Sequence, residues 1–261
     1  MDQCVSCCDI VNETRTTTMC STPRRGVNNS EFGASSSPGH HSETPLGPLA
    51  LFSFVSATRT DKVPDREQRE QLWHTLQSHF NTGIYLDTKE KGVLFPVIHF
   101  TDDRDSLKKR LSDEHALDND YVLHQGVYRE VRSIRPEGVV QNGHASNPKS
   151  TAYIVIGFKG MDKNFSQEVM VDSWKDWTGA RHIYMYLPDE MGLSKISFYH
   201  REAPHSLNMF LYVVLVECCN VSNVERQVTL GTKMRLLDFT QRLRAERMTG
   251  YISVYGVTPA D

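Results

Sequence analysis

The sequence predicts a mostly β fold, a β-sandwich with helical insertions that follows a disordered N-terminal tail. After residue 93 the apolar residues fall mostly into short, strand-like runs separated by polar turns, which is typical of a sandwich. Residues 1–47 are rich in Ser, Gly, Pro and Asn and have few large apolar side chains, so they bury too little surface to offset their ordering entropy. The predicted domains are therefore a tail over 1–47 and one β domain over 48–261.

Composition narrows the class of protein. The chain has 261 residues, of which 23% are charged and 39% hydrophobic, as in ordinary soluble proteins. Its formal net charge of -3 gives no global attraction to nucleic acid, so any basic surface has to be local. The longest apolar run, 209–216, has the length of a strand, which predicts no membrane-spanning helix. The N-terminus shows no secretory signal.

The first half of the domain combines strands with two helices. A strand is predicted over Leu49–Ala57, and a helix over Pro64–Phe80, where apolar residues recur every three or four positions. Residues 83–100 suggest two strands around a turn, with Pro96 at an edge or bulge. A short charged helix over 103–116 and a strand or strand pair over Tyr121–Ile134 follow.

The second half is predicted to consist mainly of strands. A strong strand covers Thr151–Phe158, and "RHIYMYL" (181–187) also has strand character. Four further segments complete the pattern: "LSKISFYH", "SLNMFLYVVLVECC", "RQVTLGTKMRLLDF" and "TGYISVYGV". No internal repeat is apparent.

Motifs for catalysis are absent from the sequence. It has no phosphate-binding loop, dinucleotide fingerprint, nucleophile elbow or H-E-x-x-H, so we expect no enzyme, no cofactor and no metal. Two weaker metal sites remain as alternatives. One joins the C-x-x-C of Cys4 and Cys7 to Cys20 and His40 or His41, and the other joins His182, His200 and His205.

Basic residues gather near the C-terminus. Between Arg226 and Thr249 there are six basic and two acidic side chains, a local balance of 6 − 2 = +4. Three arginines, Arg242, Arg244 and Arg247, fall within six residues. Arginine suits phosphate oxygens and guanine edges, which indicates an anionic partner. The alternative is a short surface helix with solvated arginines.

Two tryptophans, Trp174 and Trp177, lie three residues apart, which places both on roughly one face of a helix. A core element, a ligand-stacking shelf and a family signature are the three interpretations. The order of short segments favours the last. It runs "LFPVIHF", "DYVLHQGVYREV", "AYIVIGF", the tryptophan pair, "KISFYHREAP", "MFLYVVLVECC" and "GYISVYG". In this order, from about residue 94 to 257, the chain resembles the DNA-binding domain of the Grainyhead family of transcription factors.

The resemblance implies an immunoglobulin-like β-sandwich, a nuclear location, and sequence-specific binding of duplex DNA in transcription regulation. It implies that Arg242, Arg244 and Arg247 lie on the loop before the last strand and reach DNA, while Lys233 and Arg235 contact phosphates. The tryptophan pair would pack in the core, and the family's separate oligomerisation domain is absent. One rival is a β-sandwich for protein partners, viral or signalling, with no DNA role and a cytoplasmic location. The other is an enzyme assembled from distant His, Cys and acidic residues.

Overall fold

The computed structural model describes residues 47–57, 66–79, 82–88, 90–112, 121–137, 151–160, 167–203, 209–219, 221, 226–246 and 250–258. Of the tail predicted over 1–47, only Gly47 lies within these ranges. No helix among the described residues combines the length and the apolar character needed to span a membrane.

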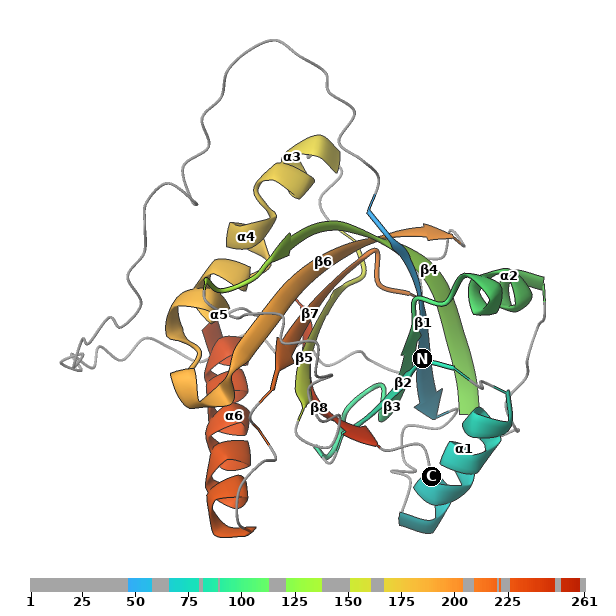
Figure 1. Ribbon diagram of the computed structural model, residues 1–261, viewed down its shortest axis with the longest axis horizontal. Helices are drawn as coiled ribbons and strands as arrows, with labels where there is room; N and C mark the ends of the chain where they lie inside the picture. Colours follow the sequence, from blue (N-terminus) through green and yellow to red (C-terminus); the bar gives the residue numbers. More distant parts are fainter. Residues whose placement is uncertain are drawn as a thin grey trace, which may run out of the picture. The chain divides into compact units, whose positions relative to one another are not determined.

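Eight strands close into an antiparallel barrel, in the order β1-β3-β2-β8-β5-β7-β6-β4 (Figure 1). The strands are β1 (Leu49–Ala57), β2 (Ile84–Asp87), β3 (Val97–Thr101), β4 (Tyr121–Ile134), β5 (Ala152–Phe158), β6 (Leu193–Ala203), β7 (Tyr212–Cys218) and β8 (Tyr251–Thr258). The immunoglobulin-like sandwich predicted from the sequence is therefore wrong. The chain is rich in strands, as expected, but they form one closed sheet in place of two packed sheets.

Helices separate the strands in a repeated pattern. The first half contains α1 (Arg66–His79) and α2 (Arg104–Ser112). The second half contains α3 (Gln167–Asp172), α4 (Trp174–Trp177), α5 (Ala180–Tyr186), the 3-10 turn η2 (Asp189–Met191) and α6 (Arg226–Glu246). Each half thus reads strand, helix or helices, two strands, helix, strand, and the strand order divides into β4-β1-β3-β2 and β8-β5-β7-β6. The halves are topological copies of each other, although no internal repeat is apparent in the sequence.

Two reciprocal hydrogen bonds involve equivalent residues of the two halves. Tyr128 on β4 and Tyr255 on β8 are both fully buried. The Tyr128 hydroxyl donates to the carbonyl of Phe210 at 2.7 Å, and the Tyr255 hydroxyl donates to the carbonyl of Phe95 at 2.7 Å. Phe95 and Phe210 each stand two residues before the third strand of their own half. Each half therefore donates a buried phenol to the other, which joins them into one core.

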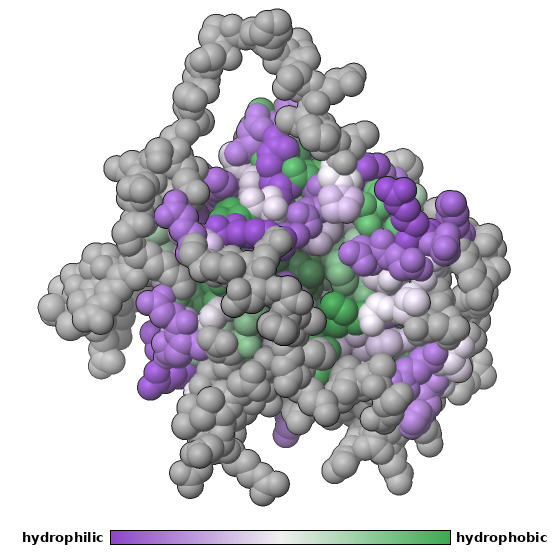
Figure 2. Space-filling model, in the orientation of Figure 1, coloured by the Kyte–Doolittle hydropathy of each residue, from purple (hydrophilic) through white to green (hydrophobic). Residues whose placement is uncertain are grey.

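Aromatic side chains fill much of the barrel interior. The Phe54 and Phe210 ring centroids lie 5.3 Å apart, and those of Phe95 and Phe210 lie 5.4 Å apart, each pair in an edge-to-face arrangement. Gly157 on β5 leaves room for this packing, because a Cβ there would lie 2.6 Å from the Phe210 ring. Figure 2 shows hydrophobic atoms gathered in the middle of one face, over the barrel, and hydrophilic atoms over the surrounding elements.

The helices pack on the outside of the barrel. On α1, Leu72, Trp73 and Leu76 pack against Val55, Tyr85 and Val97. On α4, Trp174 is 2% exposed and stacks on Phe198 of β6, with ring centroids 5.1 Å apart and planes at 9°. Trp177 meets the same Phe198 ring edge-to-face at 5.7 Å. The prediction of a packing role is confirmed: Trp174 is buried, and Trp177 is partly buried against the same ring.

Two segments predicted as strands are helices. "RHIYMYL" lies in α5, which begins after Gly179 with φ of 82° and buries Ala180, Ile183 and Tyr184. "RQVTLGTKMRLLDF" lies in α6, where Leu236, Thr240 and Leu243 are buried at helical spacing. Tyrosine, isoleucine, valine and threonine in these segments favour strands locally, and burial of one helical face outweighs that preference.

Candidate functional site

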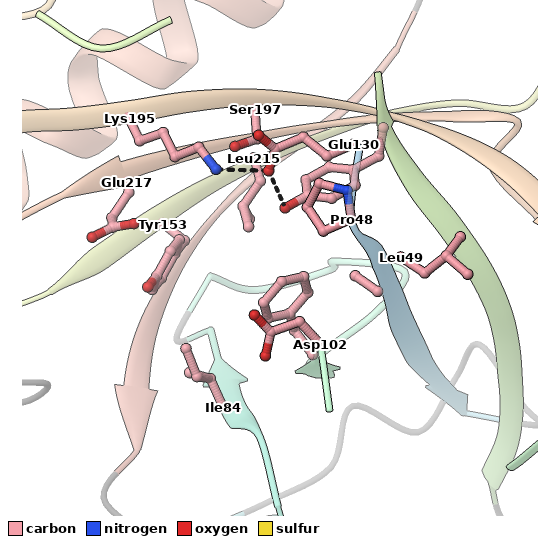
Figure 3. Close-up of a pocket in the computed structure, with 13 residues that line it drawn as sticks. Pro48, Leu49, Ile84, Asp102, Glu130, Tyr153, Lys195, Ser197, Leu215 and Glu217 are labelled. Carbon is pink, nitrogen blue, oxygen red and sulfur yellow. Dashed lines mark hydrogen bonds and ion pairs between the residues drawn. The ribbon is translucent and has the colours of Figure 1, made fainter. Parts of the chain in front are cut away.

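A pocket of about 200 Å³ occupies one end of the barrel (Figure 3). Seven of the eight strands or their ends line it, with the residues Pro48, Leu49, Ala50, Ile84, Phe100, Asp102, Glu130, Tyr153, Lys195, Ser197, Tyr199, Leu215 and Glu217. An engineered cavity of about 150 Å³ holds a benzene molecule, so this pocket has the size for a compound with a single ring.

Glu130 is the centre of the polar side chains in the pocket. Lys195 Nζ donates to Glu130 Oε2 at 2.6 Å, and the Tyr199 hydroxyl donates to the same oxygen at 3.2 Å. Figure 3 shows both interactions meeting at this one carboxylate oxygen. No hydrogen bond within the described residues uses Glu130 Oε1. The carboxylate therefore has one oxygen fixed by the protein and one available to a ligand.

The barrel seam brings these three groups together. Glu130 belongs to β4 in the first half, whereas Lys195 and Tyr199 belong to β6 in the second, and β4 pairs with β6 with Glu130 opposite Tyr199. The side chains of Lys195 and Glu130 are 20% and 12% exposed. An ion pair at this depth is screened less than one on the surface, and its Coulomb attraction is correspondingly stronger.

Tyr199 is a hydrogen-bond donor at neutral pH. Burial raises the pKa of its phenol far above the usual value, and the nearby charge of Glu130 raises it further. The phenol therefore keeps its proton and donates it in a hydrogen bond to the carboxylate. Its ring packs edge-to-face on Phe52, with centroids 5.1 Å apart, so the hydroxyl is held by a rigid aromatic support.

The side of the pocket opposite Lys195 and Ser197 is apolar except for Asp102 (Figure 3). Ala50, Ile84 and Phe100 come from β1, β2 and β3, and all three pack in the same core cluster as Phe52. A flat apolar ring can lie on this side while its polar substituents face Glu130 and Lys195. The pocket is thus amphipathic, as small-molecule sites usually are.

The arginines that the sequence singled out lie elsewhere. Arg242 and Arg244 are in helix α6, so the prediction of a loop before the last strand is wrong for them. The Arg242 side chain is 73% exposed and pairs with Asp238 at 2.5 Å, and Arg235 pairs with Glu190 at 2.5 Å. Lys233 also belongs to α6, whereas Arg247 falls outside the described residues.

Arg244 has an internal partner. Its guanidinium donates to Glu90 Oε2 at 2.5 Å and to the carbonyl of Ile252 at 2.8 Å. This arginine is therefore part of the contact between α6 and the barrel. Arg242 and Arg244 are close in sequence but have different roles, because Arg242 pairs with Asp238 and Arg244 pairs with Glu90.

The metal sites considered from the sequence do not form in the part of the chain that the structure covers. No three His, Cys, Asp or Glu side chains are grouped to hold an ion among those residues. His182 lies on α5 near Glu246, and the His200 ring packs against Tyr212. His205 and the cysteines of the tail lie outside the described residues. Burial raises the pKa of the Cys218 thiol to about 12, so this thiol stays protonated.

Known structures similar to the chain carry enzyme names. One is an anthrone oxidase-like protein, with 7% identity and a TM-score of 0.47, over 81% of this chain and 91% of that one. Another is a mutant chlorite dismutase from Candidatus Nitrospira defluvii in complex with cyanide, with 13% identity and a TM-score of 0.40, over 83% of this chain and 92% of that one. Neither likeness assigns an activity to this chain. Among the curated proteins, none matches it.

These observations correct the functional expectations. The segments that resemble the Grainyhead family lie in a closed barrel with outer helices, so the resemblance was wrong, and the DNA-binding function and transcription role that depended on it fall with it. The expectation that the chain is not an enzyme rested on the absence of sequence motifs. It is corrected as well, because the barrel brings an acid, an ammonium and a phenol together in one pocket from residues that no such motif contains.

A family model covers most of the barrel. It matches residues 80–257, which begin just before β2 and end within β8, and its description is "Domain of unknown function (DUF7153)". The match includes Glu130, Lys195 and Tyr199, together with the strands that position them. The chain belongs to the DUF7153 family.

Proposed function

We propose that the barrel pocket binds a small, single-ring organic molecule and that Glu130 transfers a proton from it, with Lys195 and Tyr199 supporting the charge that forms. The observation that carries this proposal is the pair of hydrogen bonds from Lys195 and Tyr199 to one oxygen of Glu130 inside the pocket. General acid–base chemistry needs a carboxylate whose position is fixed and whose second oxygen is accessible to a ligand.

The step balances within the pocket. Glu130 Oε1 accepts a proton from an acidic C–H or O–H of the ligand, so the ligand becomes an anion and the carboxylate becomes neutral. Lys195 then loses its charged partner and is left beside the new negative charge, which its ammonium stabilises. Tyr199, which burial keeps protonated, donates a hydrogen bond to Glu130 Oε2. Return of the proton to a different atom of the ligand would complete a tautomerisation.

Glu130, Lys195 and Tyr199 need to move little during this step. Glu130 and Lys195 extend from paired strands of a closed barrel, and Tyr199 rests on Phe52. Donors placed before the reaction, in a partly water-excluded site, stabilise a developing charge better than mobile water does.

Hydrogen–deuterium exchange into phenylacetone, a single-ring ketone with an acidic methylene, tests the proposal. In D2O, followed by proton NMR, we expect the protein to accelerate loss of the methylene signal over buffer. Glu130→Gln keeps the shape of the side chain but removes the base, so the acceleration should fall by a factor of about 10² or more. Lys195→Met should lower it as well, because the forming anion loses its partner.

Glu202→Gln is the matched control. Glu202 pairs with Arg129 across the same β4–β6 seam, but its side chain is 37% exposed and does not line the pocket. Exchange at the wild-type rate is expected for this variant. Exchange no faster than buffer with the wild-type protein, or an undiminished rate with Glu130→Gln, would show that Glu130 is not the base.

A further inference from the structure

The two halves of the barrel place equivalent residues on opposite sides of the pocket. Ala50 pairs with Tyr128 across β1 and β4, just as Tyr153 pairs with Tyr255 across β5 and β8. This register matches four pairs of positions: Ala50 with Tyr153, Ile84 with Ser197, Asp102 with Glu217, and Val257 with Glu130. All of these residues except Val257 line the pocket. In three of them the first residue is apolar and the second polar. Only the pair of Asp102 and Glu217 carries the same charge on both sides.

The charges of the pocket do not balance. Three carboxylates line it, Asp102, Glu130 and Glu217, against one ammonium, Lys195. Lys195 pairs with Glu130 at 2.6 Å. Neither Asp102 nor Glu217 forms an ion pair with another described residue, and the contact that Glu217 makes is with the Cys219 thiol at 3.9 Å. Near Asp102 and Glu217, away from the pair of Lys195 and Glu130, the pocket therefore favours a cationic group on the ligand.

Tyr153 adds a polar group that its own chain does not satisfy. Its side chain lines the pocket, the residue is 7% exposed, and its hydroxyl forms no hydrogen bond within the described residues. Burial raises the pKa of this phenol above the usual value, and the charge of Glu217 adds to the effect, so the hydroxyl stays neutral. The Tyr153 hydroxyl oxygen is not fully enclosed. It opens to the pocket, so a ligand there can hydrogen-bond to it.

Tyr153, Glu217 and Lys195 form a row across three neighbouring strands. Glu217 on β7 lies opposite Tyr153 on β5 and opposite Lys195 on β6. Figure 3 shows Glu217 and Tyr153 side by side on one side of the pocket, and the bond from Lys195 to Glu130 beside them. One end of a ligand can therefore contact Glu130 while a second polar group of the same ligand contacts the Glu217 carboxylate and the Tyr153 hydroxyl.

We propose that the substrate of this site carries a protonated amine, which binds Glu217 and the Tyr153 hydroxyl, with Asp102 supplying further negative charge at the rim. The inference rests on the proposed function and specifies its substrate class: a single-ring amine, with the ring on Ile84 and Phe100. The protonated amine donates to Glu217 and to the Tyr153 oxygen, which satisfies both groups. A carboxylate or phosphate in the same place would face Glu217 and Asp102 and would be repelled.

Calorimetric titration with three probes of one shape tests the inference: benzylamine, benzyl alcohol and benzoate. At neutral pH and low salt, where charge effects are least screened, benzylamine should bind about tenfold tighter than benzyl alcohol or better, and benzoate should show no binding. The double variant Asp102→Asn and Glu217→Gln should reduce the preference to about threefold or less, with circular dichroism unchanged. Glu202→Gln should keep the full preference.

The outcomes separate this inference from the proposed function. Binding of benzyl alcohol or benzoate as tightly as benzylamine, or a preference that survives in the double variant, overturns the amine assignment and leaves the small-molecule site in place. Absence of binding for all three probes overturns both. A third outcome is that benzylamine binds selectively but phenylacetone exchange is equally fast in wild type and Glu130→Gln. That outcome supports the amine site and refutes proton transfer by Glu130.

Discussion

Replacing Trp174 with alanine should lower the free energy of unfolding by roughly 3–5 kcal/mol. The indole is 2% exposed and lies flat on Phe198, so its removal leaves a cavity between α4 and the outer face of β6. The neighbouring Trp177 cannot fill that space, because it is fixed between Phe158, Phe198 and Tyr212 and its Nε1 donates to the carbonyl of Met170 at 2.7 Å.

Urea denaturation followed by circular dichroism measures this loss. Tyr186→Ala is the control, because Tyr186 lies on the nearby α5 but is 64% exposed, and substitutions at such sites usually change stability by about 0.5 kcal/mol or less. If Trp174→Ala and Tyr186→Ala unfold at the same urea concentration, the indole is not a core residue. Benzylamine binding should be retained in Trp174→Ala under native conditions, since Trp174 does not line the pocket.

Much of the local structure could be predicted from the sequence. The strand over Tyr121–Ile134 is observed with the predicted bounds, and the helix predicted over Pro64–Phe80 is observed over Arg66–His79. In both elements the apolar residues recur at a regular spacing, and polar residues mark where the element begins and ends. Two errors in the second half then decided the fold class. Once α5 and α6 were taken for strands, the repeated order of strands and helices disappeared, and a sandwich remained as the natural interpretation.

The site could not be predicted, because its signal depends on closure of the sheet. Along β6, Lys195, Ser197 and Tyr199 alternate with Ile196 and Phe198. In a sandwich, the face with lysine and serine would be assigned to solvent and the other to the core. In the barrel both faces are covered: Ile196 and Phe198 are buried, with Phe198 packed under Trp174 of α4, and the polar face turns into the pocket toward Glu130. Polar residues on one face of a strand therefore indicate a binding site only when it is known that this face lines a closed interior.

Tertiary contacts also decided the role of the basic cluster. Arginine density alone indicated an anionic partner, yet Arg235, Arg242 and Arg244 each bind a carboxylate of their own chain. The partners Glu190 and Glu90 are 45 and 154 residues away in sequence. No pattern within a local window reports such pairs, so the local charge balance was a poor guide to the surface.

Glu90 closes the weaker of the two seams between the halves. Strand β2 pairs with β8 only over Tyr85–Asp87 and Gly256–Thr258, whereas β4 and β6 pair over much longer stretches. Where β2 has ended, Glu90 Oε1 accepts from the backbone N–H of Val254 at 2.7 Å and from the Ser253 hydroxyl at 3.1 Å. Arg244 pairs with the other oxygen of Glu90 and donates to the carbonyl of Ile252. Glu90 and Arg244 thus bind Ile252, Ser253 and Val254 of β8, which lie beyond the residues that pair with β2.

Removal of this carboxylate should therefore open the seam. In Glu90→Ala, the N–H of Val254 and the buried Ser253 hydroxyl lose their acceptor, and Arg244 loses its counter-charge. Each such loss costs about 1–3 kcal/mol, and partial exposure of Arg244 reduces its share, so we expect the free energy of unfolding to fall by about 2–4 kcal/mol. Glu90→Gln keeps an acceptor for Val254 and should lose about half as much.

Amide hydrogen exchange locates the effect, and Asp238→Ala calibrates it. Asp238 pairs with Arg242 on the exposed face of α6, where the two side chains are 56% and 73% exposed, so its removal should cost about 0.5 kcal/mol or less. In Glu90→Ala, exchange should accelerate first in β8 and β2, while β4 and β6 keep their protection, because the long seam is intact. Uniform acceleration over the whole barrel, or equal losses of stability in Glu90→Ala and Asp238→Ala, would mean that Glu90 does not hold the short seam closed. The pocket offers a second readout, since Ile84 of β2 lines it: a seam that opens locally should weaken benzylamine binding in Glu90→Ala and leave it unchanged in Asp238→Ala.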